Sequence, residues 1–140
     1  MQGIERRWGT TVLSGFAPSG AQMAPMPGEI DWARGLDDFL DRASFEGRWA
    51  VRLGLLMAMT APVWLWGRLR SAARLSEAER ARLLDALLAH RFYAVRELAL
   101  LLKLVACMTL FRSARLRGLS GYDPAPSAKR ALAVLPRQVA

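Results

Sequence analysis

The chain has one histidine and one cysteine, His90 and Cys107, so catalysis built on a Cys–His pair would have to use these two residues. They are separated by 17 positions, about 25 Å along a continuous helix, so the two side chains cannot act as a pair. A zinc site or a disulfide framework needs several ligands or partners at fixed spacing, which a single His and a single Cys do not supply. We therefore expect no catalytic residue, no metal site and no cofactor-binding residue on this chain.

Three carboxylates, Asp37, Asp38 and Asp41, lie close together in the sequence and resemble an acid–base cluster. Apolar residues alternate with them at helical spacing, so these acids are expected to form the solvent side of an amphipathic helix. No glycine-rich loop follows a strand pattern, which leaves nucleotide binding without support. The chemistry-bearing residues thus favour a binding or structural role over an enzyme.

The charge of the chain is strongly uneven. Lys and Arg number 20 against 12 acidic residues, a net charge of +8, and six of the acids fall within residues 29–46. The basic remainder indicates an anionic partner, which is a nucleic acid, a lipid surface or an acidic protein. A nucleic acid is disfavoured, because its binding modules present basic residues with stacking aromatics on one exposed element, whereas here the arginines flank apolar runs.

Length and hydrophobicity define the fold class. A chain of 140 residues forms one domain, and a hydrophobic fraction of 53% excludes a disordered tail protein. Apolar residues recur at spacings of three and four, with no strand alternation. The sequence predicts an all-α fold of four or five helices, packed as a small irregular bundle over residues 30–122. Residues 1–29 are predicted to form an extended arm, and residues 123–140 a basic extended tail.

Polar residues at capping positions mark where helices begin. Asp31 is the predicted N-cap of the first helix and Ser44 of the second. Pro62 is expected to interrupt this second helix. Ser76 and Glu79 have the spacing of a capping box and predict the start of a further helix.

Two windows are almost wholly apolar. Residues 53–67 contain no charge over 15 positions; as a helix they reach about 22 Å, short of a hydrocarbon core of about 30 Å, so a transmembrane helix is disfavoured. Residues 98–111 carry only the charge of Lys103, which predicts burial on most sides, within the domain or in a second chain. Trp49, Trp64 and Trp66 point to a protein partner or a membrane surface, with packing in the chain's own core as the alternative.

Both ends of the chain have compositions typical of extended segments. Residues 1–29 contain five glycines and three prolines without a helical period. The arginine pair near the start lacks a following apolar stretch, so export on a signal of its own is not expected. Ordering such segments costs entropy that a large interface can offset. We therefore predict that the ends wrap a partner, anchored by Trp8 and Phe16 in one arm and by Tyr122 at the root of the other.

Residues between positions 48 and 122 carry a resemblance to a known family. They are Pro62, Trp64, Arg68, Arg70, Leu75, Ser76, Glu79, Arg80, Leu83, Leu84, Arg91, Arg96, Leu98, Leu102, Lys103, Val105, Cys107, Gly121 and Tyr122. The pattern resembles the small helical module that accompanies glucose-methanol-choline (GMC) type flavin oxidoreductases, as a separate small subunit or an N-terminal extension. It is similar in kind to the small subunit of gluconate dehydrogenases, except that this chain has no clear export signal.

The resemblance implies a non-catalytic accessory subunit that binds and stabilises a large GMC-type FAD-dependent alcohol oxidase or dehydrogenase in a hetero-oligomer. FAD, the catalytic base and the substrate pocket then belong to the partner, and this chain helps to admit an apolar alcohol or sterol. The alternative is a peripheral membrane-anchoring helical protein with no flavoprotein partner. The expected location is cytoplasmic or peripheral at the inner membrane, with export alongside a partner left open. The residues expected to bind the partner are Trp8, Phe16, Trp49, Trp64, Trp66, Arg68, Arg96 and Tyr122.

Overall fold

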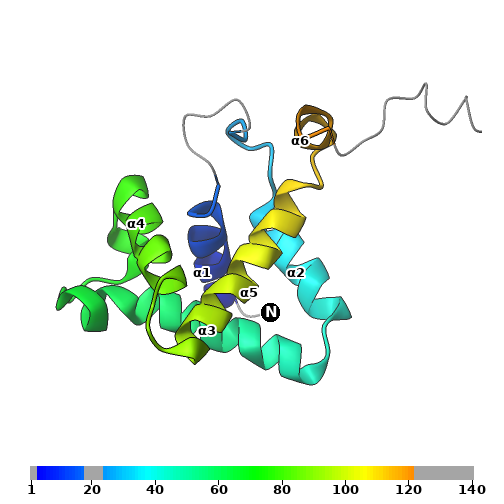
Figure 1. Cartoon of the computed structure of the whole chain (residues 1–140). Coiled ribbons are helices and arrows are strands. Elements are labelled where there is room, and N and C mark those ends of the chain that lie inside the picture. Colours follow the sequence, from blue (N-terminus) through cyan, green and yellow to red (C-terminus); the bar gives the residue numbers. More distant parts are fainter. Residues whose placement is uncertain (1–2, 18–23, 122–140) are drawn as a thin grey trace, which may run out of the picture.

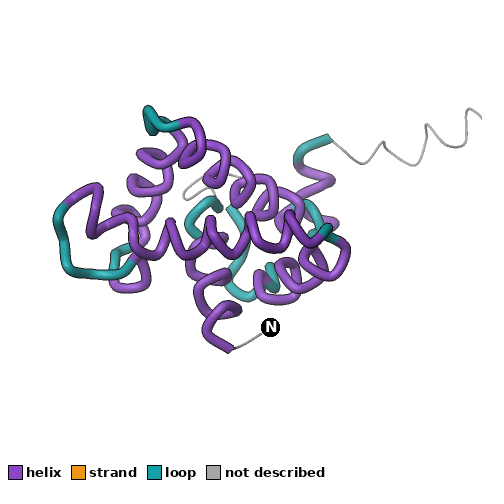
Figure 2. The backbone as a smooth tube through the Cα atoms, turned by 90° about the horizontal axis from the view of Figure 1, so that it is seen from below, coloured by secondary structure: helices purple, strands orange, loops and turns teal. Residues whose placement is uncertain are grey.

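The computed structural model describes residues 3–17 and 24–121, and in this part of the chain every regular element is helical (Figures 1 and 2). The all-α prediction is therefore confirmed, with six α-helices among the described residues, the last of them short. The predicted tail and Tyr122 lie outside the described residues. The elements are α1 (Gly3–Ser14), α2 (Trp32–Arg42), α3 (Phe45–Trp66), the 3-10 turn η1 (Ala72–Arg74), α4 (Glu77–Leu88), α5 (Tyr93–Leu110) and α6 (Ala114–Leu119).

The three predicted N-caps are all present. The Asp31 carboxylate accepts the backbone N–H of Arg34 at 2.9 Å, and the Ser44 hydroxyl accepts that of Gly47 at 3.2 Å. Ser76 begins α4 with a complete capping box, in which Glu79 reaches back to the Ser76 backbone N–H at 3.1 Å. Each cap satisfies backbone donors that no helical carbonyl can reach.

α3 runs through Pro62, so the prediction that this proline interrupts the helix is wrong. Proline lacks the N–H that would bond one turn back, which costs about 3 kcal/mol in a helix interior. Here the Pro62 ring is fully buried in the core, and this burial offsets the lost hydrogen bond. The helix ends instead at Gly67, whose φ of 63° lies in the left-handed region that glycine adopts most readily.

The N-terminal segment is also different from the prediction. Residues 3–14 form α1 rather than an extended arm, and Val12 and Leu13 are fully buried. Ion pairs tie α1 to its neighbours, from Arg6 to Asp37 of α2 at 2.7 Å and from Glu5 to Arg52 of α3 at 3.3 Å. The glycine and proline content of residues 1–29 led to the prediction of an extended arm, but the three prolines of this region all follow α1. Tertiary burial supplies the stability that the local sequence lacks.

α5 is the central helix of the bundle. It packs against α1, α2, α3 and α4, and in Figure 1 it crosses in front of α1 and above α3. Its buried side presents small and medium apolar residues, including Ala99, Leu102 and Val105. The remaining core comes from the facing sides of the other helices, chiefly Leu36, Leu40, Val51, Leu55, Ala58, Leu83, Leu84 and Leu87.

The α2 backbone approaches α5 closely at Gly35. A Cβ atom at this position would lie 2.3 Å from Cγ2 and 2.4 Å from Oγ1 of Thr109. Thr109 is itself fixed, because it is buried and its hydroxyl donates to the Val105 carbonyl at 2.8 Å. Only glycine therefore fits at this crossing without displacing α5.

We expect Gly35→Ala to lower the free energy of unfolding by about 1–2 kcal/mol, because overpacking outweighs the gain of about 1 kcal/mol from replacing a helical glycine. Urea denaturation followed by circular dichroism measures this. Gly118→Ala in α6 is the matched control, since its Cβ meets no atom within 4 Å, and it should be neutral or stabilising. Thr109→Ala added to Gly35→Ala should restore part of the loss, and an unchanged double variant would contradict the steric explanation.

Candidate functional site

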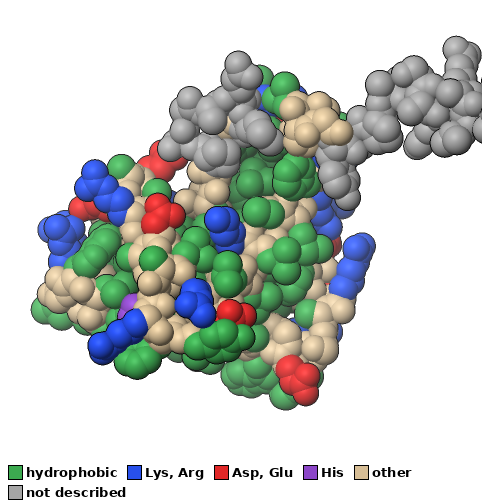
Figure 3. Space-filling model, in the orientation of Figure 1, with side chains coloured by type: hydrophobic (Ala, Val, Ile, Leu, Met, Phe, Trp, Pro, Cys, Tyr) green, Lys and Arg blue, Asp and Glu red, His purple; other side chains and the backbone are tan. Residues whose placement is uncertain are grey.

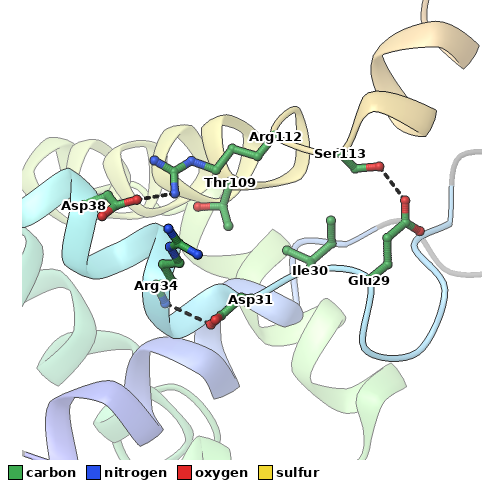
Figure 4. Close-up of a pocket in the computed structure, with 8 residues that line it drawn as sticks. All are labelled: Glu29, Ile30, Asp31, Arg34, Asp38, Thr109, Arg112 and Ser113. Carbon is green, nitrogen blue, oxygen red and sulfur yellow. Dashed lines mark hydrogen bonds and ion pairs between the residues drawn. The ribbon is translucent and has the colours of Figure 1, made fainter.

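A pocket of about 410 Å³ lies between the start of α2 and the end of α5 (Figure 4). Several of its polar groups are engaged with one another: Asp38 pairs with Arg112, Asp31 caps α2, and Glu29 bonds to Ser113. The lining residues are Glu29, Ile30, Asp31, Arg34, Asp38, Thr109, Arg112 and Ser113. These interactions link the segment before α2 and α2 itself to the end of α5 and the start of α6. We call this group of lining residues the joint.

Glu29 is the centre of this joint. Its carboxylate accepts Arg115 Nη2–H at 2.8 Å and the Met26 backbone N–H at 2.8 Å, as well as the Ser113 hydroxyl. These hydrogen bonds, led by that from Arg115, lower the pKa of Glu29 from 4.5 to about 2. The pKa of Asp38 is also lowered, mainly by its hydrogen bond from Arg112. Both carboxylates are therefore weak bases, poorly suited to proton abstraction near neutral pH.

The two residues that sequence reasoning set aside as unsuited to catalysis lie in different settings. His90 accepts the Phe92 backbone N–H at its Nδ1 atom, 3.2 Å away, and its ring meets that of Trp64 edge-on at 5.6 Å. Cys107 is half-buried on α5. In residues 3–17 and 24–121, no group of three or more His, Cys, Asp or Glu side chains has the arrangement to hold a metal ion.

The described partner-binding residues that the sequence predicted fall into three groups. Trp8 and Phe16 pack against the chain's own core, so their prediction as anchors on an extended arm is wrong. Trp49, Trp64 and Trp66 are 55%, 45% and 37% exposed along α3. The other two described residues are Arg68, which pairs with Glu79 at 2.8 Å, and Arg96, which lies 5.5 Å from the centre of the Tyr93 ring.

The outer sides of α3 and α5 each carry a row of exposed large apolar side chains. On α3 the row is Phe45, Trp49, Leu53 and Leu56; on α5 it is Leu100, Leu104, Met108 and Phe111. We call these the α3 row and the α5 row. Their spacing of three or four residues places each row on one helical face. Figure 3 shows hydrophobic side chains along α5 and at the lower edge of the molecule, where α3 runs.

Sequence reasoning selected only one member of these rows, Trp49. The available signal was that residues 98–111 are apolar nearly all round, which a single buried face does not require. Which of these side chains reach solvent depends on where α1, α2 and α4 cover α5, and no local pattern encodes that.

α3 meets the length and composition of a membrane-spanning helix, and no second described helix does. Its most apolar 18-residue window is 39% buried within the bundle. The core helix of a soluble protein passes the same test, so length and composition alone do not assign α3 to a membrane.

Comparison with known protein families, with curated proteins and with solved structures found no match. The likeness to the small modules of GMC-type oxidoreductases therefore depends on the residues named in the sequence and stays a prediction. The structure itself shows two features: an apolar surface on α3 and α5, and the joint, whose charged side chains are paired, at the start of α2 and the end of α5.

Glu29 gives a prediction for pH. Its pKa is lowered on folding, so its stabilising contribution is complete above the unfolded value of 4.5 and is lost as the pH falls through about 2. Glu29→Gln should thus reduce the urea midpoint at neutral pH, and the difference from the wild type should vanish near pH 2. Glu97→Gln, on the exposed side of α5, is the control and should change little at either pH. A pH-independent loss in Glu29→Gln would contradict the ionic explanation.

Proposed function

We propose that this chain is a non-catalytic accessory subunit that binds a larger protein through the α3 and α5 rows. The observation that carries the proposal is the exposure of eight large apolar side chains on the outer faces of two helices that pack together. Soluble monomers rarely leave large contiguous apolar surfaces in water, and such surfaces mark interaction sites.

Burial of these rows would supply ample binding free energy. Transfer of apolar surface from water contributes about 25 cal/mol per Å², and an aromatic side chain can bury about 150–250 Å². Phe45 and Trp49 are 75% and 55% exposed, and their rings meet edge-on at 6.2 Å. A pre-formed pair of this kind loses little side-chain entropy on binding, which makes it a good central anchor.

The partner that the sequence resemblance indicates is the large subunit of a GMC-type FAD-dependent alcohol oxidase or dehydrogenase. In this proposal the partner supplies FAD, the base and the substrate pocket, and the present chain stabilises it and helps to admit an apolar alcohol or sterol. The paired state of Glu29 and Asp38 supports a non-catalytic role for this chain, because both carboxylates are held in ion pairs by arginines.

The test is co-purification of the tagged chain with such a flavoprotein, followed by flavin absorbance. Leu53→Glu and Leu104→Glu, which place a charge in each row, should each weaken the complex by about tenfold or more, equivalent to about 1.4 kcal/mol. Glutamate keeps helix propensity, so the fold should persist. Leu119→Glu is the matched control, because Leu119 is 52% exposed, close to the 55% of Leu53 and 53% of Leu104, but lies on α6.

Retention of flavoprotein binding by both row variants would overturn the assignment of this surface. Failure to recover any flavin-containing chain with the wild type would instead overturn the choice of partner.

Replacement of the single histidine and the single cysteine tests the proposal that this chain is non-catalytic. We expect His90→Ala and Cys107→Ala to leave the turnover of the assembled complex nearly unchanged, because His90 Nδ1 accepts the Phe92 backbone N–H and Cys107 is half-buried on α5. Steady-state kinetics of the purified complex measures this. Loss of turnover with assembly intact would show that one of the two acts in the chemistry.

A further inference from the structure

One end of the molecule combines exposed aromatic and aliphatic side chains with arginines. It is formed by the last turn of α3, the loop that follows Gly67, the outer side of α4 and the connection between α4 and α5, at the left of Figure 1. We call it the tip and define it by Trp64, Trp66, Leu69 and Phe92 with Arg68, Arg70, Arg82 and Arg91.

Contacts across the tip join its segments into one surface. The Trp64 ring of α3 meets the His90 ring at 5.6 Å, and His90 lies 5.3 Å from Phe92. Arg68 pairs with Glu79 at the start of α4 at 2.8 Å. The segments 64–68, 76–79 and 90–92 are therefore held together although they are distant in the sequence.

Arginine and aromatic rings are paired at the tip. Arg68 lies 5.7 Å from the centre of the Trp66 ring, and Arg91 lies 4.7 Å from that of Phe92. Leu69, between Arg68 and Arg70, is 91% exposed. Contact with water is unfavourable for an apolar side chain that is almost fully exposed, and here two cations flank it. The same arrangement suits a surface that contacts a membrane, where anionic headgroups cover an apolar interior.

The charge of this region is positive. Residues 64–93 contain six arginines and three acidic residues, and with the Arg68–Glu79 ion pair set aside, five arginines and two acidic residues remain. A hollow of about 410 Å³ between α3 and α4 is lined by Trp66, Arg68, Glu79 and Arg82. Figure 3 shows basic side chains around this end of the molecule. The acids of α2 lie toward the other end of the molecule, where Asp37 pairs with Arg6 and Asp38 with Arg112.

We propose that the tip binds the headgroup layer of a membrane that contains anionic phospholipids. Tryptophan is favoured at the headgroup level, arginine forms paired hydrogen bonds with phosphate, and basic residues beside an apolar anchor bind anionic leaflets. Leu69 and Trp66 reach toward the acyl boundary while the arginines neutralise phosphates. The tip shares no residue with the α3 and α5 rows, so lipid binding at the tip leaves the residues of the two rows available to the protein partner.

The experiment is flotation of the full-length chain with vesicles of phosphatidylcholine alone or mixed with phosphatidylglycerol, with tryptophan fluorescence as the second readout. The wild type should float only with the anionic vesicles, with blue-shifted emission, and should be released by salt. Leu69→Glu and Arg70→Glu should each reduce binding by about tenfold. The matched controls Leu119→Glu and Arg7→Glu should bind like the wild type, because both residues are exposed and lie outside the tip, Leu119 on α6 and Arg7 on α1 beside the start of α2.

Equal flotation of the tip variants and the wild type overturns the proposal, as does flotation that is independent of phosphatidylglycerol. Binding to soluble poly-glutamate without binding to vesicles also overturns it and assigns the tip to an acidic protein. Circular dichroism confirms that Leu69→Glu and Arg70→Glu keep the helical fold, which is expected because both positions are exposed in a loop. Because the row residues are unaltered, loss of vesicle binding with flavoprotein binding intact separates this proposal from the proposed function.

Discussion

The close packing of α2 and α3 on α5 is the constraint on which the rest of the structure depends. At Gly35 the α2 backbone meets Thr109 with no room for a methyl group, and at Gly54 an added Cβ would lie 3.3 Å from Leu102. With these approaches fixed, α1 fills the space between α2, α3 and α5. The joint at Glu29 then holds the segment before α2 against α6. Small residues at the crossings thus allow α2 and α3 to pack closely on α5.

The same arrangement explains the exposed apolar surface. α3 and α5 are apolar on more than one face, and a bundle of this size covers only one face of each. The opposite faces carry the α3 and α5 rows, where water contact is unfavourable unless another molecule covers them. A chain with this excess of apolar surface suits a role in assembly, and its paired carboxylates fit a subunit whose partner performs the chemistry.

Local features were predictable from the sequence because they depend on residues within one turn. Asp31, Ser44 and Ser76 cap helices through hydrogen bonds that span three positions, so their spacing alone revealed them. The continuation of α3 through Pro62 and the formation of α1 were not predictable in this way. Both depend on burial against segments that are distant in the sequence, and that burial offsets a weak local preference. The Glu29 joint was equally hidden, since its partners Ser113 and Arg115 are 84 and 86 positions away.

The sequence by itself determined the helical class, the main helix starts, the uneven charge and the presence of a single histidine and a single cysteine, because composition and short-range spacing specify each of these. Only the tertiary structure decided that Trp8 and Phe16 face the core while Trp49, Trp64 and Trp66 face water. It also gathered the arginines and aromatic rings of three segments into one tip. Helical periodicity shows that a side chain lies on an apolar face, but the exposure of that face depends on which other helices cover it.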